Sequence, residues 1–462
     1  MSFDPILADI RFGCGLSPAI APPDSAAALL AQLRAPDAIA AAFPVETFPQ
    51  FRQRMVERAR QTKIRRNNRG TPQAEAARKA ARRLNQVARK DAMAWLAHHM
   101  LRRTHTQNPF RERLAFFWGD HFTARGKQGI IWRGTSPYVE SAIRPNMTGS
   151  FADLLIAAVT HPLMLHYLDQ WNSYGPASPA ALRSRRPRGL NENLAREVLE
   201  LHTLGVDGPY SQDDVRQLAE LFTGMTMQVQ VGFKFDKHMA EPGAEMVLGK
   251  QYGGTDNPHI RDVQAVLRDL SVHPATAAHV ARKLAVHFVS DVPDPDLVAA
   301  MIRRWRETDG DLGTVYAAML DHPGAWDMSR PNVKQPVDFI GSACRALAIP
   351  PDALTPPDEK ALQQRLFDPM ALMGQIWERP EGPDGWAEAD SDWITPQGVA
   401  ARLQWAVSAP QLLMPQLPDP RDFVISALGM RAPRAVQFAA AAAETRPDGV
   451  GIVLASPAFQ RA

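Results

Sequence analysis

The 462-residue chain lacks the features that mark secreted or membrane-spanning proteins. Its two cysteines, Cys14 and Cys344, provide neither a disulfide framework nor the ligand spacing of a zinc finger. The first residues contain no basic segment followed by an apolar one, so no signal peptide is predicted. The apolar stretch Leu154–Leu168 is interrupted by His161 and Pro162 and is too short to cross a bilayer. We therefore expect a cytoplasmic protein without a membrane span.

The chain also lacks the short motifs of several common enzyme classes. It contains no GxxxxGK[ST] phosphate-binding loop and no GxGxxG motif between a strand and a helix. The zinc-binding motif HExxH and the nucleophile motif GxSxG are absent as well. These absences argue against P-loop nucleotide hydrolases, dinucleotide-binding enzymes, zinc proteases of this type and α/β-hydrolases.

Proline, by contrast, is abundant, and the 39 prolines predict many short helices with rigid connections. Nearly every segment has helical periodicity. The exception is Thr226–Lys250, where Met227, Val229 and Val231 alternate with polar residues or glycine, as in a strand. We therefore expect a mainly α, large and irregular multi-helix fold with one small β-hairpin near residues 226–250. Four prolines in residues 349–358 suggest a linker, so we expect a helical main domain over 1–348 and a C-terminal helical part over 349–462.

Positive charge is concentrated near the N-terminus, although the net charge of the chain is only +3. Residues 51–90 contain fourteen lysines and arginines and two glutamates. Such a segment could contact a polyanion. However, Phe51 is its only aromatic residue, and no known nucleic-acid-binding module fits it. The ordinary expectation is a solvated basic face, and nucleic acid is not the partner that we expect.

One predicted helix has the highest density of potential catalytic groups. At about 100° per residue, Glu192, Arg196, Glu197 and Glu200 share one of its faces. Glu197 and Glu200 repel each other unless a proton, a cation or water intervenes. His202 falls within the opposite, apolar face. The helix is therefore either a solvated acidic face with a core histidine or one wall of a polar cleft.

The signals after this helix are local and clear. Gly205 stands where a helix end favours glycine. Ser211 and Asp214 have the spacing of a capping box at the start of the next helix. We therefore expect two helices joined by a tight loop.

Several blocks of the chain, in one order, are typical of a known family. The most specific runs from Asn191-Glu192-Asn193-x-Ala195-Arg196-Glu197 to Leu204-Gly205, followed by Tyr210 and Thr223-Gly224. The others include Arg111-Glu112-Arg113, Phe117-Trp118 with His121-Phe122, Arg144-Pro145, Tyr167-Leu168-Asp169, Lys334-x-Pro336 and Pro383-x-Gly385-Trp386. By this ordered set the chain resembles the bacterial domain-of-unknown-function 1800 family (DUF1800). The resemblance implies a mostly helical bacterial protein.

The chain departs from the family pattern at two positions. Asn146 stands where the family usually has a histidine, and Gln170 where it usually has an asparagine. If that histidine is a metal ligand in relatives, this chain lacks it. An amide side chain could still hydrogen-bond a substrate.

His121, beside Phe117 and Trp118 on a helix that should be buried, completes the candidate site. As a general base or metal ligand it would need a carboxylate partner such as Asp169, Glu197 or Glu200. The Glu-x-x-His spacing of di-iron bundles is absent. We predict a polar cleft whose candidate catalytic residues are His121, Arg144, Asp169, Glu192, Arg196, Glu197 and Glu200.

The sequence leaves open whether the protein is an enzyme. Our first hypothesis is an enzyme that uses this histidine and carboxylate cleft on an unknown small molecule or protein partner, with a divalent metal left open as cofactor. The alternative is a non-enzymatic protein that binds a polyanion or assists a partner. Members of the resembled family are often encoded beside proteins of the domain-of-unknown-function 1501 family, so the resemblance implies a partner of that kind.

Overall fold

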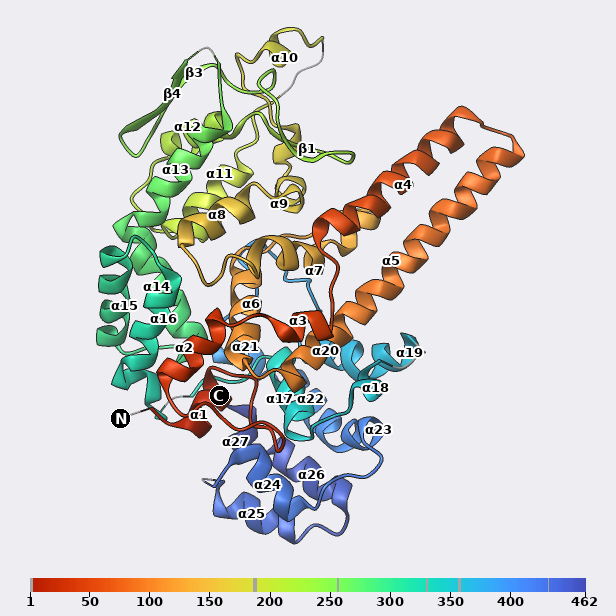
Figure 1. The fold of residues 1–462 in the computed structure, drawn as a ribbon, viewed down its shortest axis with the longest axis vertical. Coiled ribbons are helices and arrows are strands. Elements are labelled where there is room, and N and C mark those ends of the chain that lie inside the picture. Colours follow the sequence, from red (N-terminus) through yellow and green to blue (C-terminus); the bar gives the residue numbers. More distant parts are fainter. Residues whose placement is uncertain (1–2, 186–188, 256, 330, 356–358, 431) are drawn as a thin grey trace.

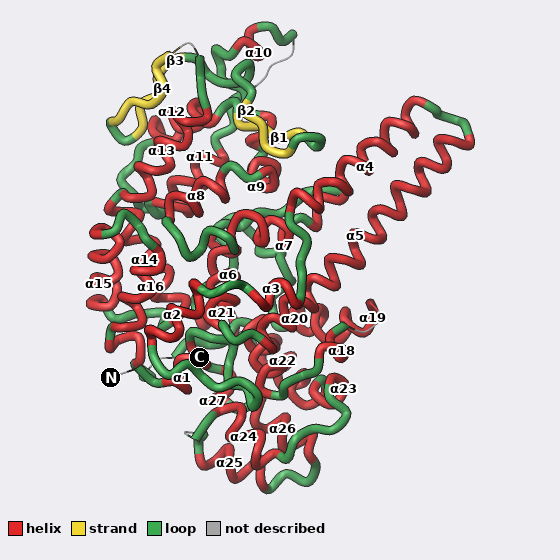
Figure 2. The backbone as a smooth tube through the Cα atoms, in the orientation of Figure 1, coloured by secondary structure: helices red, strands yellow, loops and turns green. Residues whose placement is uncertain are grey.

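The computed structural model describes residues 3–185, 189–255, 257–329, 331–355, 359–430 and 432–462. The chain forms an elongated helical body from which one pair of long helices projects (Figure 1). Strands occupy only one end of the body (Figure 2). The predicted mainly α fold class is confirmed.

The projecting pair consists of α4 (Phe48–Asn67) and α5 (Pro72–His105), which run antiparallel and follow the short helices α1 (Pro5–Arg11), α2 (Ala26–Arg34) and α3 (Ala38–Ala42). The outer half of α5 buries a row of alanines, Ala74, Ala77, Ala81 and Ala88. Their spacing of three, four and seven residues places them on one side of the helix. Small side chains there let the two helices pack closely, and we call residues 52–90 the arm.

The central helix α6 (Pro109–His121) is buried along most of its length. Its first turn is set by Asn108, whose side chain accepts from the Arg111 amide, and by Pro109 at the first helical position. The chain continues through η1 (Ile130–Arg133), α7 (Thr135–Tyr138), the π-helix η2 (Val139–Ile143), α8 (Phe151–Val159), α9 (Pro162–Tyr167), η3 (Gln170–Asn172) and α10 (Pro179–Leu182).

The predicted acidic helix is α11 (Asn193–Glu197), but it continues as a π-helix, η4 (Val198–Thr203), rather than as a regular α-helix. The backbone amide of Leu204 donates to the carbonyl of Leu199, five residues earlier. Gly205 follows with a positive φ of 92°, as the helix-end signal predicts. The next helix, α12 (Gln212–Phe222), begins with the predicted capping box of Ser211 and Asp214.

Two β-hairpins occupy the region where the alternation predicts one. Strand β1 (Met225–Gln228) pairs with β2 (Gly232–Phe235), and β3 (Gly243–Val247) pairs with β4 (Lys250–Thr255), both antiparallel. The chain reverses at Val231, whose amide donates to the Gln228 carbonyl. Alternation with period 2 continues through this turn, so it cannot reveal where one strand ends and the next begins.

The remaining helices form two hydrophobic cores. The larger core includes α13 (Ile260–Val272), α14 (Pro274–Phe288), α15 (Pro295–Glu307), α16 (Leu312–Asp321) and η5 (Pro323–Trp326). The smaller core is built on α17 (Pro336–Ala346) and on Leu96–Leu101 of α5. It is completed by α18 (Pro351–Leu354), α19 (Glu359–Leu362), η6 (Gln363–Phe367), α20 (Asp368–Leu372), α22 (Pro396–Ser408), α23 (Pro410–Leu413), α24 (Pro420–Leu428), α25 (Arg434–Ala441), α26 (Arg446–Ala455) and α27 (Pro457–Gln460), and α21 (Asp390–Trp393) lies beside it.

The predicted division at residue 348 remains a prediction. Within the described ranges, no helix has both the length and the apolar character needed to cross a bilayer.

Candidate active site

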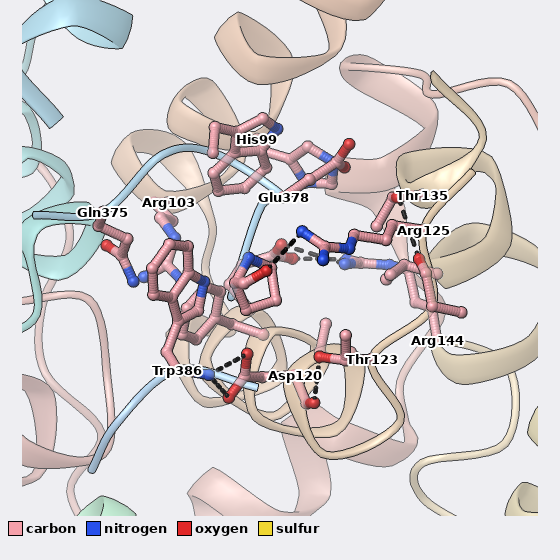
Figure 3. Close-up of a pocket in the computed structure, with 18 residues that line it drawn as sticks. His99, Arg103, Asp120, Thr123, Arg125, Thr135, Arg144, Gln375, Glu378 and Trp386 are labelled. Atoms are coloured by element: carbon pink, nitrogen blue, oxygen red, sulfur yellow. Dashed lines mark hydrogen bonds and ion pairs between the residues drawn. The ribbon is translucent and has the colours of Figure 1, made fainter. Parts of the chain in front are cut away.

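A cavity of about 80 Å³ lies where α5, α6 and the end of η2 meet the segment 375–386, which we call the pocket loop (Figure 3). Phe116, Trp377 and Trp386 contribute aromatic walls. The polar lining comes from His99, Arg103, Glu112, Asp120, Thr123, Arg125, Thr135, Arg144, Gln375 and Glu378. A concave site with apolar walls and several convergent polar groups is the form that small-molecule sites take.

Arg144 follows the π-helix η2 directly and is charge-compensated. Its guanidinium donates to Glu112 at 3.0 Å and to Asp37 at 2.6 and 3.0 Å. Burial alone would lower the pKa of Arg144, but the two carboxylates outweigh burial and raise it. Arg144 therefore holds three chain segments together and brings no free positive charge to the pocket.

Asp120, at the end of α6, is held by the pocket loop. Both of its carboxylate oxygens accept from the backbone amide of Trp386 at 3.0 Å. The close approach depends on Gly385, which has a φ of 86° and where a Cβ atom would lie 2.5 Å from an oxygen of Asp120. Burial and the nearby Glu388 raise the pKa of Asp120 well above its usual value.

Glu378, Ser136 and His99 form a continuous hydrogen-bonded chain. The Ser136 hydroxyl donates to Glu378 Oε1, and His99 Nε2 lies 3.3 Å from the same hydroxyl oxygen. Burial raises the pKa of Glu378 to about 7. Burial, together with the positive charge of Arg102, lowers the pKa of His99, so this imidazole is neutral. Figure 3 shows Glu378 and Asp120 on opposite sides of the pocket.

The backbone at Glu378 is strained. Its φ of 56° lies in the left-handed region, which a residue with a Cβ atom rarely adopts. Such a conformation costs about 1–3 kcal/mol and persists only where the surrounding structure imposes it. Strain of this kind is concentrated at functional sites, and here it falls on the residue that ends the hydrogen-bonded chain.

Two further arginines hold the pocket loop without carboxylate partners. Arg125 donates to the carbonyls of Pro380 at 2.7 Å and Glu381 at 2.9 Å. The Arg379 guanidinium lies 3.5 Å from the centre of the Trp132 ring and donates to the Trp132 carbonyl. Neither arginine forms an ion pair with any residue that the structure describes. The charge of Arg379 is partly offset by the adjacent Glu378, whereas Arg125 has no ion-pair partner among the described residues.

The structure places His121 outside this pocket. His121 is 2% exposed, and its Nε2–H donates to the carbonyl of His202 at 3.3 Å. His279 donates in the same way to the carbonyl of Leu201 at 3.1 Å. These carbonyls belong to the last turn of η4 and would otherwise lack partners. Burial and the positive charge of Lys283 lower the pKa of His121, so it is neutral.

The predicted acidic residues gather on the half-exposed side of the same helix. Arg196 lies 3.1 Å from Glu200 and 3.5 Å from Glu192, with 38% of its side chain exposed. Burial raises the pKa of Glu197 to about 7, and Glu200 and Asp384 add to the effect. In the described structure no hydrogen bond joins His121 to any of these glutamates.

The other two predicted residues lie in different surroundings. Asp169 has a left-handed φ of 58° and pairs with Lys127 at 2.6 Å, and its side chain is 47% exposed. Arg144 lines the pocket, as the only one of the seven predicted residues to do so. Across the described part of the chain, no three His, Cys, Asp or Glu side chains converge to hold a metal ion.

The acidic face and the pocket nevertheless adjoin the same loop. Asp384 of the pocket loop raises the pKa of Glu197 and, more weakly than burial and Glu388, that of Asp120. Asp384 is therefore close enough to act electrostatically on both groups of carboxylates.

Sequence reasoning missed most of the pocket. A sequence motif could have indicated Asp120, because this residue directly precedes His121 in one of the family's blocks. Gly385 and Trp386 belong to another such block. His99, Ser136 and Glu378 had no such signal, since they share no local motif.

Comparison with known proteins gives a family and nothing closer. No curated protein and no solved structure is detectably similar to the chain. The family described as "Protein of unknown function (DUF1800)" matches residues 10–461, nearly the whole length, and the chain belongs to this family.

Proposed function

We propose that the pocket is the active site of an enzyme that transfers a proton to or from a small anionic substrate. The observation that carries the proposal is the chain Glu378–Ser136–His99, which ends in the pocket at Glu378. Candidate general acids and bases need a pKa near the working pH, and the pKa of Glu378 is about 7.

The hydrogen-bonded chain can adopt two directions. When Glu378 is ionised, His99 Nε2–H donates to Ser136 and the Ser136 hydroxyl donates to the carboxylate. When Glu378 is protonated, it donates to Ser136, and Ser136 donates to the unprotonated nitrogen of His99. Because Nε2 donates in the first direction and accepts in the second, His99 stays neutral but changes from the Nε2–H to the Nδ1–H tautomer, losing the proton from Nε2 and gaining one at Nδ1. The hydrogen-bonded chain can thus accommodate a change in the protonation of Glu378 while Glu378 and Ser136 keep their hydrogen bond.

The charge of the pocket supports an anionic substrate. Arg144 is balanced by Glu112 and Asp37, and Arg103 by Asp338. Arg125 lines the pocket, donates to two backbone carbonyls and interacts with Tyr167, and it forms an ion pair with no carboxylate that the structure describes. Its uncompensated charge would favour a carboxylate or phosphate group over a neutral ligand.

This proposal retains the predicted histidine and carboxylate chemistry but assigns it to different residues. His121 supports the end of η4, and Glu192, Arg196, Glu197 and Glu200 flank the pocket loop from outside. Asp169 takes no part. A cytoplasmic location and an accessory role beside a DUF1501 partner remain predictions.

Binding and proton transfer can be tested separately. Isothermal titration with acetate, succinate, malate and glycerol 3-phosphate should identify an anion that the wild-type protein binds. Arg125→Gln should weaken that binding at least about tenfold, because it removes a charged hydrogen-bond donor. Proton NMR in D₂O should then show exchange of carbon-bound hydrogen in the bound anion.

Glu378→Gln should keep the binding and slow the exchange by about 10²–10⁴-fold, the usual contribution of a general acid or base. Glu381→Gln, in the same loop but exposed, is the matched control and should leave both unchanged. The proposal fails if the wild-type protein binds none of these anions, or if exchange is equally fast in the Glu378 variant.

A further inference from the structure

The arm carries a large net positive charge, although the chain as a whole is only weakly positive. Residues 51–90 carry a net charge of +12, whereas the whole chain carries +3, so the remaining residues carry −9. Eleven of the fourteen cationic side chains are exposed, and Glu75 is the only exposed carboxylate of the arm. The arm projects from the body with solvent on several sides (Figure 1). Its charge therefore faces outward and does not dock on an acidic face of the same molecule.

The arginines of the arm form ion pairs and hydrogen bonds with other parts of the chain mainly at the base of the arm. Arg54 pairs with Glu46 and Asp91, and Arg52 donates to the carbonyl of Val229 in the β1–β2 turn. Farther out, Arg60 contacts Glu57. These contacts fix the direction of the arm and leave its outer cations available.

The cations of α5 form a regular stripe. At about 100° per residue, Arg78, Arg82 and Arg89 fall within about 40° of one another, and Lys79, Arg83 and Lys90 form a second row about 100° away. The buried alanine row, which faces α4, lies about 90° from the first row of cations and about 170° from the second. The stripe spans about 18 Å at about 1.5 Å per residue. Of the six, only Arg89 is paired with a described carboxylate, that of Glu359.

We propose that this stripe binds the phosphate backbone of a double-stranded nucleic acid. The two rows flank a ridge about as wide as one helix, and a single α-helix fits the major groove of a duplex, with phosphates on both walls. The absence of aromatic side chains from residues 52–90 excludes stacking on unpaired bases, but contacts with duplex phosphates need none. This proposal replaces the expectation from sequence that the basic segment is only a solvated face.

A lipid surface fits the arm less well. Helices that bind bilayers bury an apolar face in the lipid, whereas the apolar face of α5 is covered by α4. Val87, which is 47% exposed, is the one large apolar side chain of α5 that remains open to solvent within the described arm. A continuous row of phosphates matches the regular spacing of the stripe better than the mixed charges of a folded protein surface do.

The proposal predicts a specific dependence on salt. Six phosphate contacts give a slope of about −5 for the logarithm of the binding constant against the logarithm of the salt concentration. Affinity for a fluorescein-labelled 30-base-pair duplex should thus fall about a thousandfold between 50 and 200 mM NaCl. Fluorescence anisotropy with the full-length protein measures both quantities.

Variants can distinguish binding by the stripe from binding by positive charge elsewhere on the surface. Arg82→Gln with Arg83→Gln should reduce the slope by about 2, one unit per lost contact. Arg78→Gln with Lys79→Gln should give the same change and provides a second test if the first variant is unstable. Arg303→Gln with Arg306→Gln removes the same charge from exposed positions on α15 and should leave the slope unchanged.

Three outcomes would overturn the proposal. The duplex could fail to bind at 50 mM NaCl. The α15 variant could weaken binding as much as the stripe variants do. A single strand of equal length, or vesicles of phosphatidylserine and phosphatidylcholine, could bind more tightly than the duplex at the same ionic strength, which would assign the arm to a different partner.

Discussion

Replacing Glu378 with glutamine should remove a defined part of the pH dependence of stability. The pKa of Glu378 is raised by burial from the usual 4.5 to about 7 in the folded chain. The folded state therefore favours the protonated carboxyl group. This contribution to stability is fully present below pH 4.5 and is lost as the pH rises through 7. Glutamine keeps the shape of the protonated group and cannot titrate.

The expected size follows from these two values. The difference between 4.5 and about 7 corresponds to about 3 kcal/mol of free energy of unfolding, and about 2.5 kcal/mol of it falls between pH 5 and pH 8. Other carboxyl groups with raised pKa values, such as Glu197 and Asp9, also titrate in this range. They are present in both proteins, so their contributions cancel when the pH dependence of the variant is subtracted from that of the wild type.

Urea unfolding at pH 5 and pH 8, followed by tryptophan fluorescence and by circular dichroism, measures the effect. The wild-type protein should lose about 2.5 kcal/mol more than Glu378→Gln over this interval. The two probes should give the same midpoint. Glu381→Gln, exposed in the same loop, should behave as the wild type does. Equal pH dependence in the wild type and the Glu378 variant would refute the reasoning, because it would mean that Glu378 is ionised in the folded chain at both pH values.

Three further substitutions test other contacts of the site. Gly385→Ala should lower stability by at least about 2 kcal/mol in a thermal melt, since it combines a φ of 86° with a Cβ atom 2.5 Å from Asp120; an unchanged melting temperature would show that the loop does not approach Asp120. Arg144→Met should cost about 3–5 kcal/mol in urea unfolding because it leaves Glu112 buried without its partner, and adding Glu112→Gln should recover part of the loss. Arg196→Ala should cost less than about 1 kcal/mol in the same assay, as its side chain is 38% exposed, and a loss of several kcal/mol would indicate a buried network instead.

Local signals in the sequence predicted local structure well. The glycine at position 205 ends the helix, and Ser211 with Asp214 begins the next one, because caps depend on residues three or four positions apart. The mainly α fold class follows from the same kind of information. The π-helix was not predicted, since an extra residue in a helical turn leaves the periodicity of a short segment almost unchanged.

The pocket could not be predicted because its parts are far apart in the sequence. Ser136 and Glu378 are separated by 242 residues, and Asp120 and Trp386 by 266. The prediction of a cleft at Glu197 rests on the densest group of charged residues in the sequence, and it stays a prediction. In the structure that group remains half-exposed, and its ion pairs are those of a surface helix.

The π-helix η4 makes the length of its segment more important than its composition. The carbonyls of Leu201 and His202 accept hydrogen bonds from His279 and His121 only where the last turn of η4 presents them to these rings. Deleting one residue between Val198 and Thr203 would rotate that turn by about 100° and turn both carbonyls away from the histidines. Single substitutions in this segment would leave the turn in place. We therefore expect natural variants of the chain to keep the character of the buried residues Val198, Leu199, His202 and Thr203 and to tolerate neither an insertion nor a deletion here.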